Sequence, residues 1–279
     1  MNSSSAKNAA KDAGDSTQDA ARDVSRSRGF RLVARSGYAV NGILHALIGG
    51  IAISIALGEG GSADQSGALA GLAATPGGVF VLWFAVVGLV GLGAWQVVQA
   101  IIVPPQDEKR KWAERAKEFG KAVAYLAVAS TAFTYARGGS SDSSSDSTSV
   151  TATLLESPVG VALVVALGLA VIAIGGYFVF KGATKKFHED VAIPGGTLGR
   201  AVDAAGVVGY IAKGVALAVV GILFIVAGVT HDASEATGLD GALKSLTELP
   251  FGQVILWVVG AGLIAFGVYC FARARWTKL

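Results

Sequence analysis

Four polar residues stand within or beside long apolar runs, where a buried amine, imidazole or amide could bind or relay something: Asn41, His45, Lys121 and Lys213. His45 follows Asn41 by four residues, so both lie on one face of a helix. A histidine placed there can relay protons or bind a ligand. Lys213 follows the uncharged run 204–212, which would set it well along a helix. Two blander interpretations stay open: amines that reach the interface, and a histidine bonded to a backbone carbonyl.

These residues occupy matching places in a pattern that is written three times. An apolar run is followed by a polar loop, a proline and a second apolar run, and Asn41, Lys121 and Lys213 correspond without a gap. The second runs align on two further sets, which are Pro76, Pro158 and Pro250, and, seventeen residues later, Gly93, Gly175 and Gly267. Such repeats indicate three helix pairs around an axis along the membrane normal. The three polar residues would then form a ring at the inner mouth of a pseudo-threefold bundle.

The composition favours lipid as the solvent of these runs. Hydrophobic residues make up 52% of the chain, charged residues 15%, and the mean hydropathy is +0.56. A membrane-spanning helix needs about 17 to 25 apolar residues. Six segments approach this length, and the third of them is short: 38–57, 79–103, 122–136, 159–180, 204–230 and 252–272. We therefore expect an all-α membrane protein with six transmembrane helices, arranged as three tandem two-helix repeats around a pseudo-threefold axis.

Local signals give these helices their starts and their packing faces. Thr75 and Ser157 directly precede two of the prolines, and this pairing is typical of a helix N-cap followed by the first helical residue. The second span of each repeat should therefore begin at its proline. The aligned glycines of these spans should let neighbouring helix backbones approach closely.

Lysine and arginine are distributed unevenly about the predicted spans. All of them except Arg137 and Lys244 fall on the side that carries both chain ends, while nine carboxylates fall on the other side. The positive-inside rule then places the protein in the cytoplasmic (inner) membrane with both termini cytoplasmic. A basic inner face could attract anionic lipids. Nucleic acid is a poor candidate partner, because topology already accounts for these charges.

The sequence divides into a tail and three repeats. Residues 1–34 are expected to form a disordered cytoplasmic tail, followed by repeats at 35–105, 106–186 and 187–279. The serine-rich outer loop 138–150 in the second repeat is expected to be a flexible linker. Before the proline, the first and third repeats carry a matching Gly-Ala-Leu stretch, at 67–69 and 241–243, which the second repeat has lost.

Motifs of known chemistry are missing from the sequence. No HExxH or CxxC occurs, no GxGxxG follows a strand, and Cys270 is the single cysteine. We therefore expect no catalytic residues, no cofactor and no metal site.

Several stretches resemble a known family. They are 37–42 with His45, 209–214, 237–243 continuing through 250–252, and 269–275. The chain resembles the bacterial, mostly actinobacterial, membrane family catalogued as domain of unknown function 1206. This resemblance implies three tandem two-helix repeats in a membrane, and it brings no activity, cofactor or catalytic residue with it.

The sequence leaves three functional hypotheses. The favoured one is a non-enzymatic structural or interaction membrane protein that packs against lipids, a membrane-protein partner or a second copy of itself. The alternative is a small channel or transporter with a path along the pseudo-threefold axis. An intramembrane enzyme is the weakest, because neither a nucleophile with a base nor a metal set is present.

Overall fold

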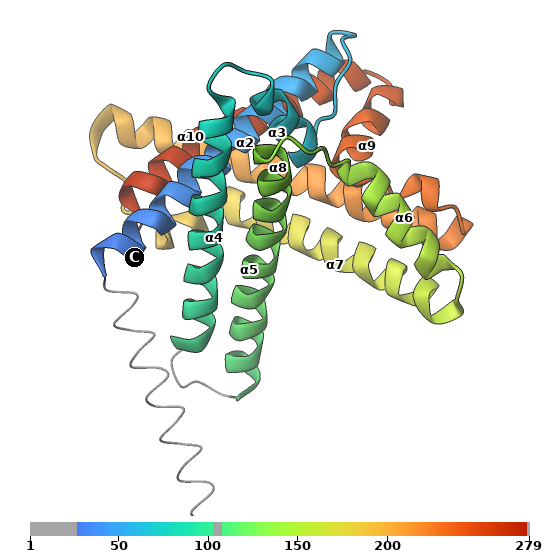
Figure 1. The fold of residues 1–279 in the computed structure, drawn as a ribbon, viewed down its shortest axis with the longest axis horizontal. Coiled ribbons are helices and arrows are strands. Elements are labelled where there is room, and N and C mark those ends of the chain that lie inside the picture. Colours follow the sequence, from blue (N-terminus) through green and yellow to red (C-terminus); the bar gives the residue numbers. More distant parts are fainter. Residues whose placement is uncertain (1–26, 103–107, 278–279) are drawn as a thin grey trace, which may run out of the picture.

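The computed structural model of this chain describes residues 27–102 and 108–277, and helices make up nearly all of this part (Figure 1). The long helices in it are α2 (Arg28–Ala56), α4 (Gly78–Ile102), α5 (Glu108–Ala136), α7 (Pro158–Ala183), α8 (Gly196–Thr230) and α10 (Gly252–Trp276). Shorter helices precede α4, α7 and α10, and they are α3 (Gln65–Ala73), α6 (Ser143–Leu155) and α9 (Gly238–Ser245). The prediction of an all-α fold is confirmed.

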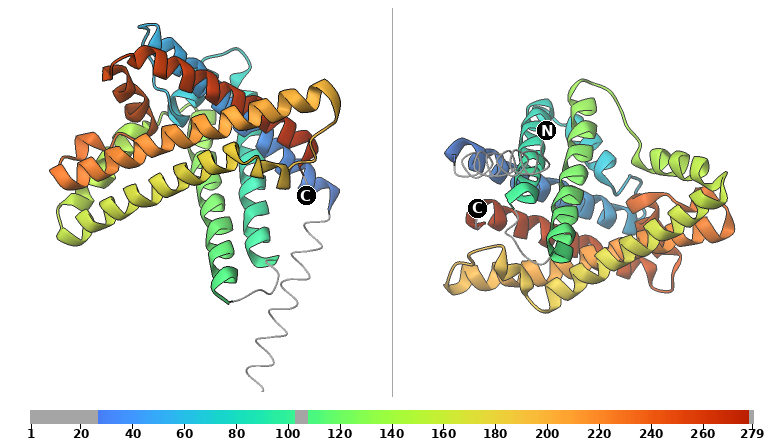
Figure 2. Two further views of the ribbon diagram at one scale, coloured as in Figure 1. Left: turned by 180° about the vertical axis from the view of Figure 1, so that it is seen from behind. Right: turned by 90° about the horizontal axis from the view of Figure 1, so that it is seen from below.

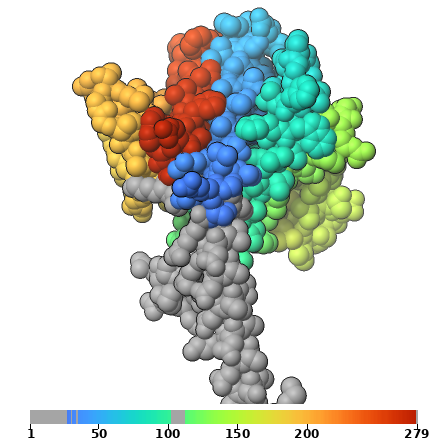
Figure 3. All heavy atoms as spheres, turned by 60° about the vertical axis from the view of Figure 1, so that its left-hand side comes forward, coloured from blue at the N-terminus to red at the C-terminus, as the bar shows by residue number. Residues whose placement is uncertain are grey.

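The long helices pack as three pairs, and each pair joins two different repeats. Helix α4 packs along α5, α7 along α8, and α10 returns to pack along α2. The α7 and α8 helices lie side by side in both views of Figure 2, and in Figure 1 the α4/α5 pair runs across them. Additional contacts of α2 with α4 and of α10 with α8 join the pairs. Figure 3 shows α2 in blue between α10 in red and α4 in teal.

Glycine pairs bring the backbones of two of these helix pairs together. A Cβ added to Gly175 would lie 2.6 Å from the carbonyl oxygen of Gly214, and one added to Gly267 would lie 2.6 Å from that of Gly42. Any side chain at these positions would push the helices apart. The aligned Gly93 differs, because its added Cβ would meet the Leu126 side chain at 3.0 Å. The α4/α5 contact therefore involves a side chain where the other two pairs have backbone against backbone.

The outer surfaces of the helices are apolar. Large hydrophobic side chains are exposed along them, including Phe80 at 83%, Leu163 at 55% and Val258 at 65%. Within the described residues, five helices are long and apolar enough to cross a membrane: Arg31–Ala56, Gly78–Ile101, Pro158–Ala183, Gly196–Thr230 and Gly252–Trp276. Such surfaces fit a multi-pass membrane protein. Helix α5 is not among the five, because its first half is charged.

The predicted helix starts hold in one repeat and shift in the other two. Ser157 caps α7, since its hydroxyl accepts a hydrogen bond from the Gly160 N–H at 3.1 Å, and Pro158 is the first helical residue. In the first repeat, Thr75 donates instead to the Leu72 carbonyl at 2.7 Å, which closes α3, and α4 begins two residues after Pro76. Helix α10 likewise begins two residues after Pro250.

The expectation of a flexible serine-rich linker at 138–150 is wrong for most of that segment, because α6 begins at Ser143. The Asp142 carboxylate accepts hydrogen bonds from the N–H groups of Ser144 and Ser145 at 3.0 and 3.1 Å, so it caps the helix. The second repeat therefore has its short helix although the Gly-Ala-Leu stretch is lost. Residues 1–26 of the predicted tail lie outside the described residues, and α2 begins at Arg28, before the predicted boundary.

Candidate functional site: a cavity between the helices

A cavity of about 160 Å³ lies between the long helices. Its lining comes from the long helices α2, α4, α5, α8 and α10 and from the short helices α3 and α9. The lining residues are Asn41, Leu44, His45, Ile48, Gln65, Leu89, Ala124, Tyr125, Val128, Lys213, Ala216, Leu217, Leu239 and Leu263. Most of these side chains are apolar, with a few polar groups among them, which is the usual make-up of a small-ligand site.

Three of the four predicted polar residues meet at this cavity. Asn41, His45 and Lys213 line it, although more than 160 residues separate Lys213 from the other two. Lys121 does not line it. The Lys121 amine lies 2.6 Å from the carboxylate of Glu118, three residues earlier on the same helix. Lys121 therefore forms a salt bridge on the flank of α5 and does not join Asn41 and Lys213 in the expected ring of three.

The lining residues hold equivalent positions in the three repeats. The position of Asn41 corresponds to that of Lys213, and four residues further along the aligned spans stand His45, Tyr125 and Leu217. The same holds for Leu44, Ala124 and Ala216, for Leu89 and Leu263 on the second spans, and for Gln65 and Leu239 on the short helices. All three repeats therefore contribute to one cavity, although the helix α7 of the second repeat contributes none of the lining.

Hydrogen bonding fixes the chemical form of the imidazole. His45 Nδ1 lies 2.8 Å from the Asn41 carbonyl oxygen, and a carbonyl can only accept, so Nδ1 carries a proton. In the neutral ring Nε2 is then the acceptor. The Asn41 amide nitrogen lies 3.5 Å from the sulfur of the buried Cys270. The interpretation of His45 as a histidine bonded to a backbone carbonyl therefore holds for Nδ1, one of its two ring nitrogens.

Phe266 contacts both the imidazole and the amine. Its ring centroid is 4.8 Å from that of His45, and the Lys213 amine lies 4.5 Å from the Phe266 centroid. The same amine lies 5.4 Å from the ring of Phe178. Two aromatic faces thus stabilise the Lys213 charge. None of the ion pairs found among the described residues includes Lys213, so its charge has no carboxylate partner there.

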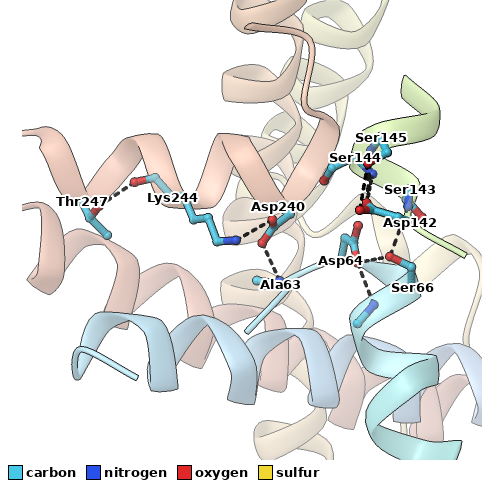
Figure 4. Close-up of polar contacts among 11 residues, drawn as sticks. Ala63, Asp64, Ser66, Asp142, Ser143, Ser144, Ser145, Asp240, Lys244 and Thr247 are labelled. Carbon is cyan, nitrogen blue, oxygen red and sulfur yellow. Dashed lines mark hydrogen bonds and ion pairs between the residues drawn. The ribbon is translucent and has the colours of Figure 1, made fainter. Parts of the chain in front are cut away.

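The short helices α3, α6 and α9, with the residues that lead into them, are called the cap here. Hydrogen bonds join its three parts, and Figure 4 shows those donated by Ala63 and Ser143. The Ala63 N–H donates to the Asp240 carboxylate at 2.7 Å, which links the first repeat to the third. The Ser143 N–H donates to the Ser66 hydroxyl at 3.3 Å, which links the second repeat to the first. The Ser147 hydroxyl donates to the Ala236 carbonyl at 2.7 Å, which links the second repeat to the third, so that each repeat is bonded to the other two.

Three acidic side chains accept hydrogen bonds in the cap, and Asp240 and Asp64 are buried there. Asp240 is 6% exposed and also accepts from the Lys244 amine at 2.7 Å. Asp64 is 2% exposed and accepts from the Ser66 hydroxyl and the Gly67 N–H. Hydrogen bonds from the Ser145 N–H and hydroxyl lower the pKa of the Asp142 carboxyl below its ordinary value. Gln65 and Leu239 belong to this cap and line the cavity, so the cap contributes to its wall.

An ion-pair cluster lies near the C-terminal end of α10, whereas the cap precedes the N-terminal end of that helix. Asp190 follows α7 and lies 2.6 Å from the Lys181 amine and 3.9 Å from the Arg273 guanidinium. Burial acts to raise the pKa of Asp190, but Arg273 and Lys181 outweigh it and hold that pKa below its ordinary value. The Arg273 guanidinium also lies 4.5 Å from the Tyr38 ring centroid. This cluster fastens the link after α7 to α10, where Val191 forms a bridge with Thr277.

Comparison with known proteins gives the family of the chain. Three segments, residues 36–102, 116–185 and 208–277, match a family described as Domain of Unknown Function (DUF1206). This chain belongs to the DUF1206 family. The three matches contain one cavity-facing first-span helix each, from α2, α5 and α8 in turn. The resemblance stated from the sequence is confirmed.

One curated relative is also of uncharacterised function. The DUF1206 chain is 29% identical over 250 residues to an "Uncharacterized protein YxxB" of Bacillus subtilis (strain 168), and the match covers 86% of this chain and 88% of the relative. No solved structure matches the chain.

Sequence reasoning missed, among others, two residues that line this DUF1206 cavity, and one residue that contacts its polar groups. Tyr125 and Leu217 stand at the positions equivalent to His45, so extending the gapless alignment by one helical turn would have found them. Phe266 gave no signal, since one phenylalanine in an apolar span looks like any other. Its role depends on the approach of α10 to both α2 and α8.

Proposed function

We propose that this chain is a six-span protein of the cytoplasmic membrane that moves a small solute through its central cavity. The observation that carries the proposal is the cavity itself, which all three repeats line at equivalent positions and where Asn41, His45 and Lys213 meet. Sites at the interface of structural repeats are common in membrane transporters. The fold alone would not carry this proposal, because similar folds host unrelated functions.

The cyclic order of helix pairs supports a pseudo-threefold arrangement. Each repeat passes its second span to the first span of the next, from α4 to α5, from α7 to α8, and from α10 back to α2. The apolar half of α5, residues 122–136, takes the sixth place in this order and would be the sixth span. It is short, but Lys121 and Arg137 border it and can reach outward to the interfaces.

Orientation and surroundings complete the proposal. The excess of lysine and arginine on the side of the chain ends supports cytoplasmic termini, with the cap facing outward. Anionic lipids at the inner face are proposed neighbours on the same basis. The expectations that the chain is not an enzyme and binds no nucleic acid stay predictions.

The structural or interaction hypothesis, which the sequence alone favours, takes second place. Its support was the glycine-rich helix faces, the few buried charges and the lack of a motif of known chemistry. The glycine faces are now occupied by contacts inside the chain, such as Gly175 with Gly214 and Gly267 with Gly42. The exposed apolar side chains are accounted for by lipid. Few features of the structure therefore call for a membrane-protein partner or a homo-oligomer, whereas the cavity calls for a ligand or solute.

A swelling assay on proteoliposomes tests the path. Urea, glycerol, acetate and butyrate serve as probes, and we expect at least one to enter faster than into protein-free liposomes. Ala216→Phe should abolish that gain, because Ala216 lines the cavity and is 2% exposed. Val215→Phe is the matched control, since Val215 is the next residue and is 38% exposed on the outer surface.

The proposal fails if the wild-type protein leaves the permeability to every probe unchanged. It also fails if Ala216→Phe, recovered as a folded protein by size-exclusion chromatography, conducts the same probe as fast as the wild type does.

A further inference from the structure

The charge of the central cavity is one-sided. Among the described residues that line it, Lys213 is the only charged one, and the remainder are amides, one imidazole, one phenol and apolar side chains. A charge held in a low-dielectric interior is costly unless an opposite charge compensates it. The nearby rings of Phe266 and Phe178 offset part of that cost.

We propose that the cavity binds a small monocarboxylate, with the carboxylate on the Lys213 amine and an apolar end among the leucines. This inference rests on the proposed function, because it names the class of solute for the same cavity. One lysine matches one negative charge. A dianion such as sulfate would leave a second charge uncompensated, and a cation would be repelled.

Asn41 supplies a second donor for the carboxylate. Its amide carries two N–H groups, and sulfur, the partner found for this amide at 3.5 Å, is only a weak acceptor. Asn41 and Lys213 hold the same register in their repeats and line the same cavity. A carboxylate has two oxygens, so it can accept from both residues at once.

The rest of the lining fits a short hydrocarbon. Leu44, Ile48, Leu89 and Leu263 are each at most 2% exposed and line the cavity beyond the polar residues. An apolar protein cavity of about 150 Å³ is large enough for benzene. At about 160 Å³ this cavity would therefore hold butyrate or benzoate, whereas a fatty-acid chain is too long for it.

The chain offers a matched pair of lysines for the test. Lys213→Met removes the charge inside the cavity. Lys121→Met removes a charge at the equivalent position of α5, and the Lys121 side chain does not line the cavity. Binding of butyrate, benzoate, sulfate and dodecanoate to the full chain is measured by calorimetry in a neutral maltoside detergent. We expect saturable binding of butyrate and benzoate, and weak binding of sulfate and dodecanoate.

Lys213→Met should weaken the binding of butyrate and benzoate about 10- to 100-fold, as the loss of a charge-assisted hydrogen bond does. Lys121→Met should leave it unchanged. Where Lys213→Met is not recovered folded, Asn41→Asp serves instead, because it is nearly isosteric and its carboxylate would compete for the Lys213 amine. It should weaken binding in the same direction.

Four results would overturn the inference: no saturable carboxylate binding to the wild type, equal binding to the folded Lys213→Met or Asn41→Asp protein, an equal loss in Lys121→Met, or tighter binding of dodecanoate than of butyrate. The last result would point to a lipid source for the carboxylate. Binding and flux separate the two proposals. If Ala216→Phe blocks a flux of urea or glycerol but no carboxylate binds, the proposed function stands and the proposed ligand class fails. If a carboxylate binds but no probe is conducted, the ligand class stands and the proposed function fails.

Discussion

At the scale of single residues, position in a repeat does not decide what a side chain does. Lys121 and Lys213 hold equivalent positions, but Lys121 has Glu118 one turn before it and forms a salt bridge at the side of α5. The residues before Lys213 are uncharged, and its amine lies over the Phe266 ring. The immediate neighbours along the helix therefore separate a surface ion pair from a candidate binding group.

The Asp190 cluster gives a pH-dependent prediction at this scale. The pKa of Asp190 is lower in the folded protein than its ordinary value of about 3.9. A carboxyl of this kind stabilises the fold fully above its unfolded pKa, and the stabilisation is lost as the pH falls through the folded pKa. Asp190→Asn should cost about 1 to 3 kcal/mol at pH 7, because the largely buried Lys181 loses its carboxylate.

Thermal unfolding followed by tryptophan fluorescence in detergent measures this effect. The wild type should unfold at a higher temperature than Asp190→Asn at pH 7, and the difference should shrink toward pH 3. Lys186→Met is the control, since Lys186 is exposed and the Asp190 cluster does not include it. A difference of equal size at both pH values would contradict the assignment.

At the scale of elements, the cap shows how a helix can form from a serine-rich segment. Serine has a modest helix propensity, so composition favoured a linker at 138–150. Asp142 caps the N-terminus of α6, and Thr151 in the second half of the helix is buried against its neighbours. Contacts of α6 with α7 and α9 then hold it in place. Capping and tertiary contact together outweigh propensity here.

Removal of the Asp142 N-cap should loosen α6 alone. Asp142→Ala should destabilise the helix by about 1 kcal/mol, because the N–H groups of Ser144 and Ser145 lose their acceptor. Hydrogen–deuterium exchange should then accelerate in Ser143–Leu155 and stay unchanged in α9. Asp142→Asn is the matched control, since asparagine caps helices about as well as aspartate does. Equal acceleration in both variants would show that charge, and not capping, holds the helix.

At the scale of the whole molecule, the cyclic exchange of helices between repeats explains why one cavity forms. If each repeat packed only within itself, three separate hairpins would result. Instead α10 returns to α2, and backbone contacts such as that of Gly267 with Gly42 close the ring. The α4/α5 pair lacks a glycine pair at its matching place and has the Leu126 side chain at Gly93.

Topology gives the prediction at this scale. Ser149→Cys places a thiol on the exposed face of α6, and Lys186→Cys places one beyond the end of α7. A membrane-impermeant maleimide should label the first in intact cells and the second only after permeabilisation, because the cap is proposed to face outward. The wild type gives the background, since its single cysteine, Cys270, is buried. The reverse labelling pattern would overturn the orientation.

Helix content, the three repeats, the apolar spans and the positions of Asn41, His45 and Lys213 follow from the sequence by itself, because hydropathy and register are properties of the order of residues. The cavity, the exclusion of Lys121 from it, the contacts of Phe266 with both His45 and Lys213, and the linked cap depend on the tertiary structure. Each of these needs residues from helices far apart in the chain to meet, and which helices pair depends on which backbones can approach. A local pattern does not contain that information.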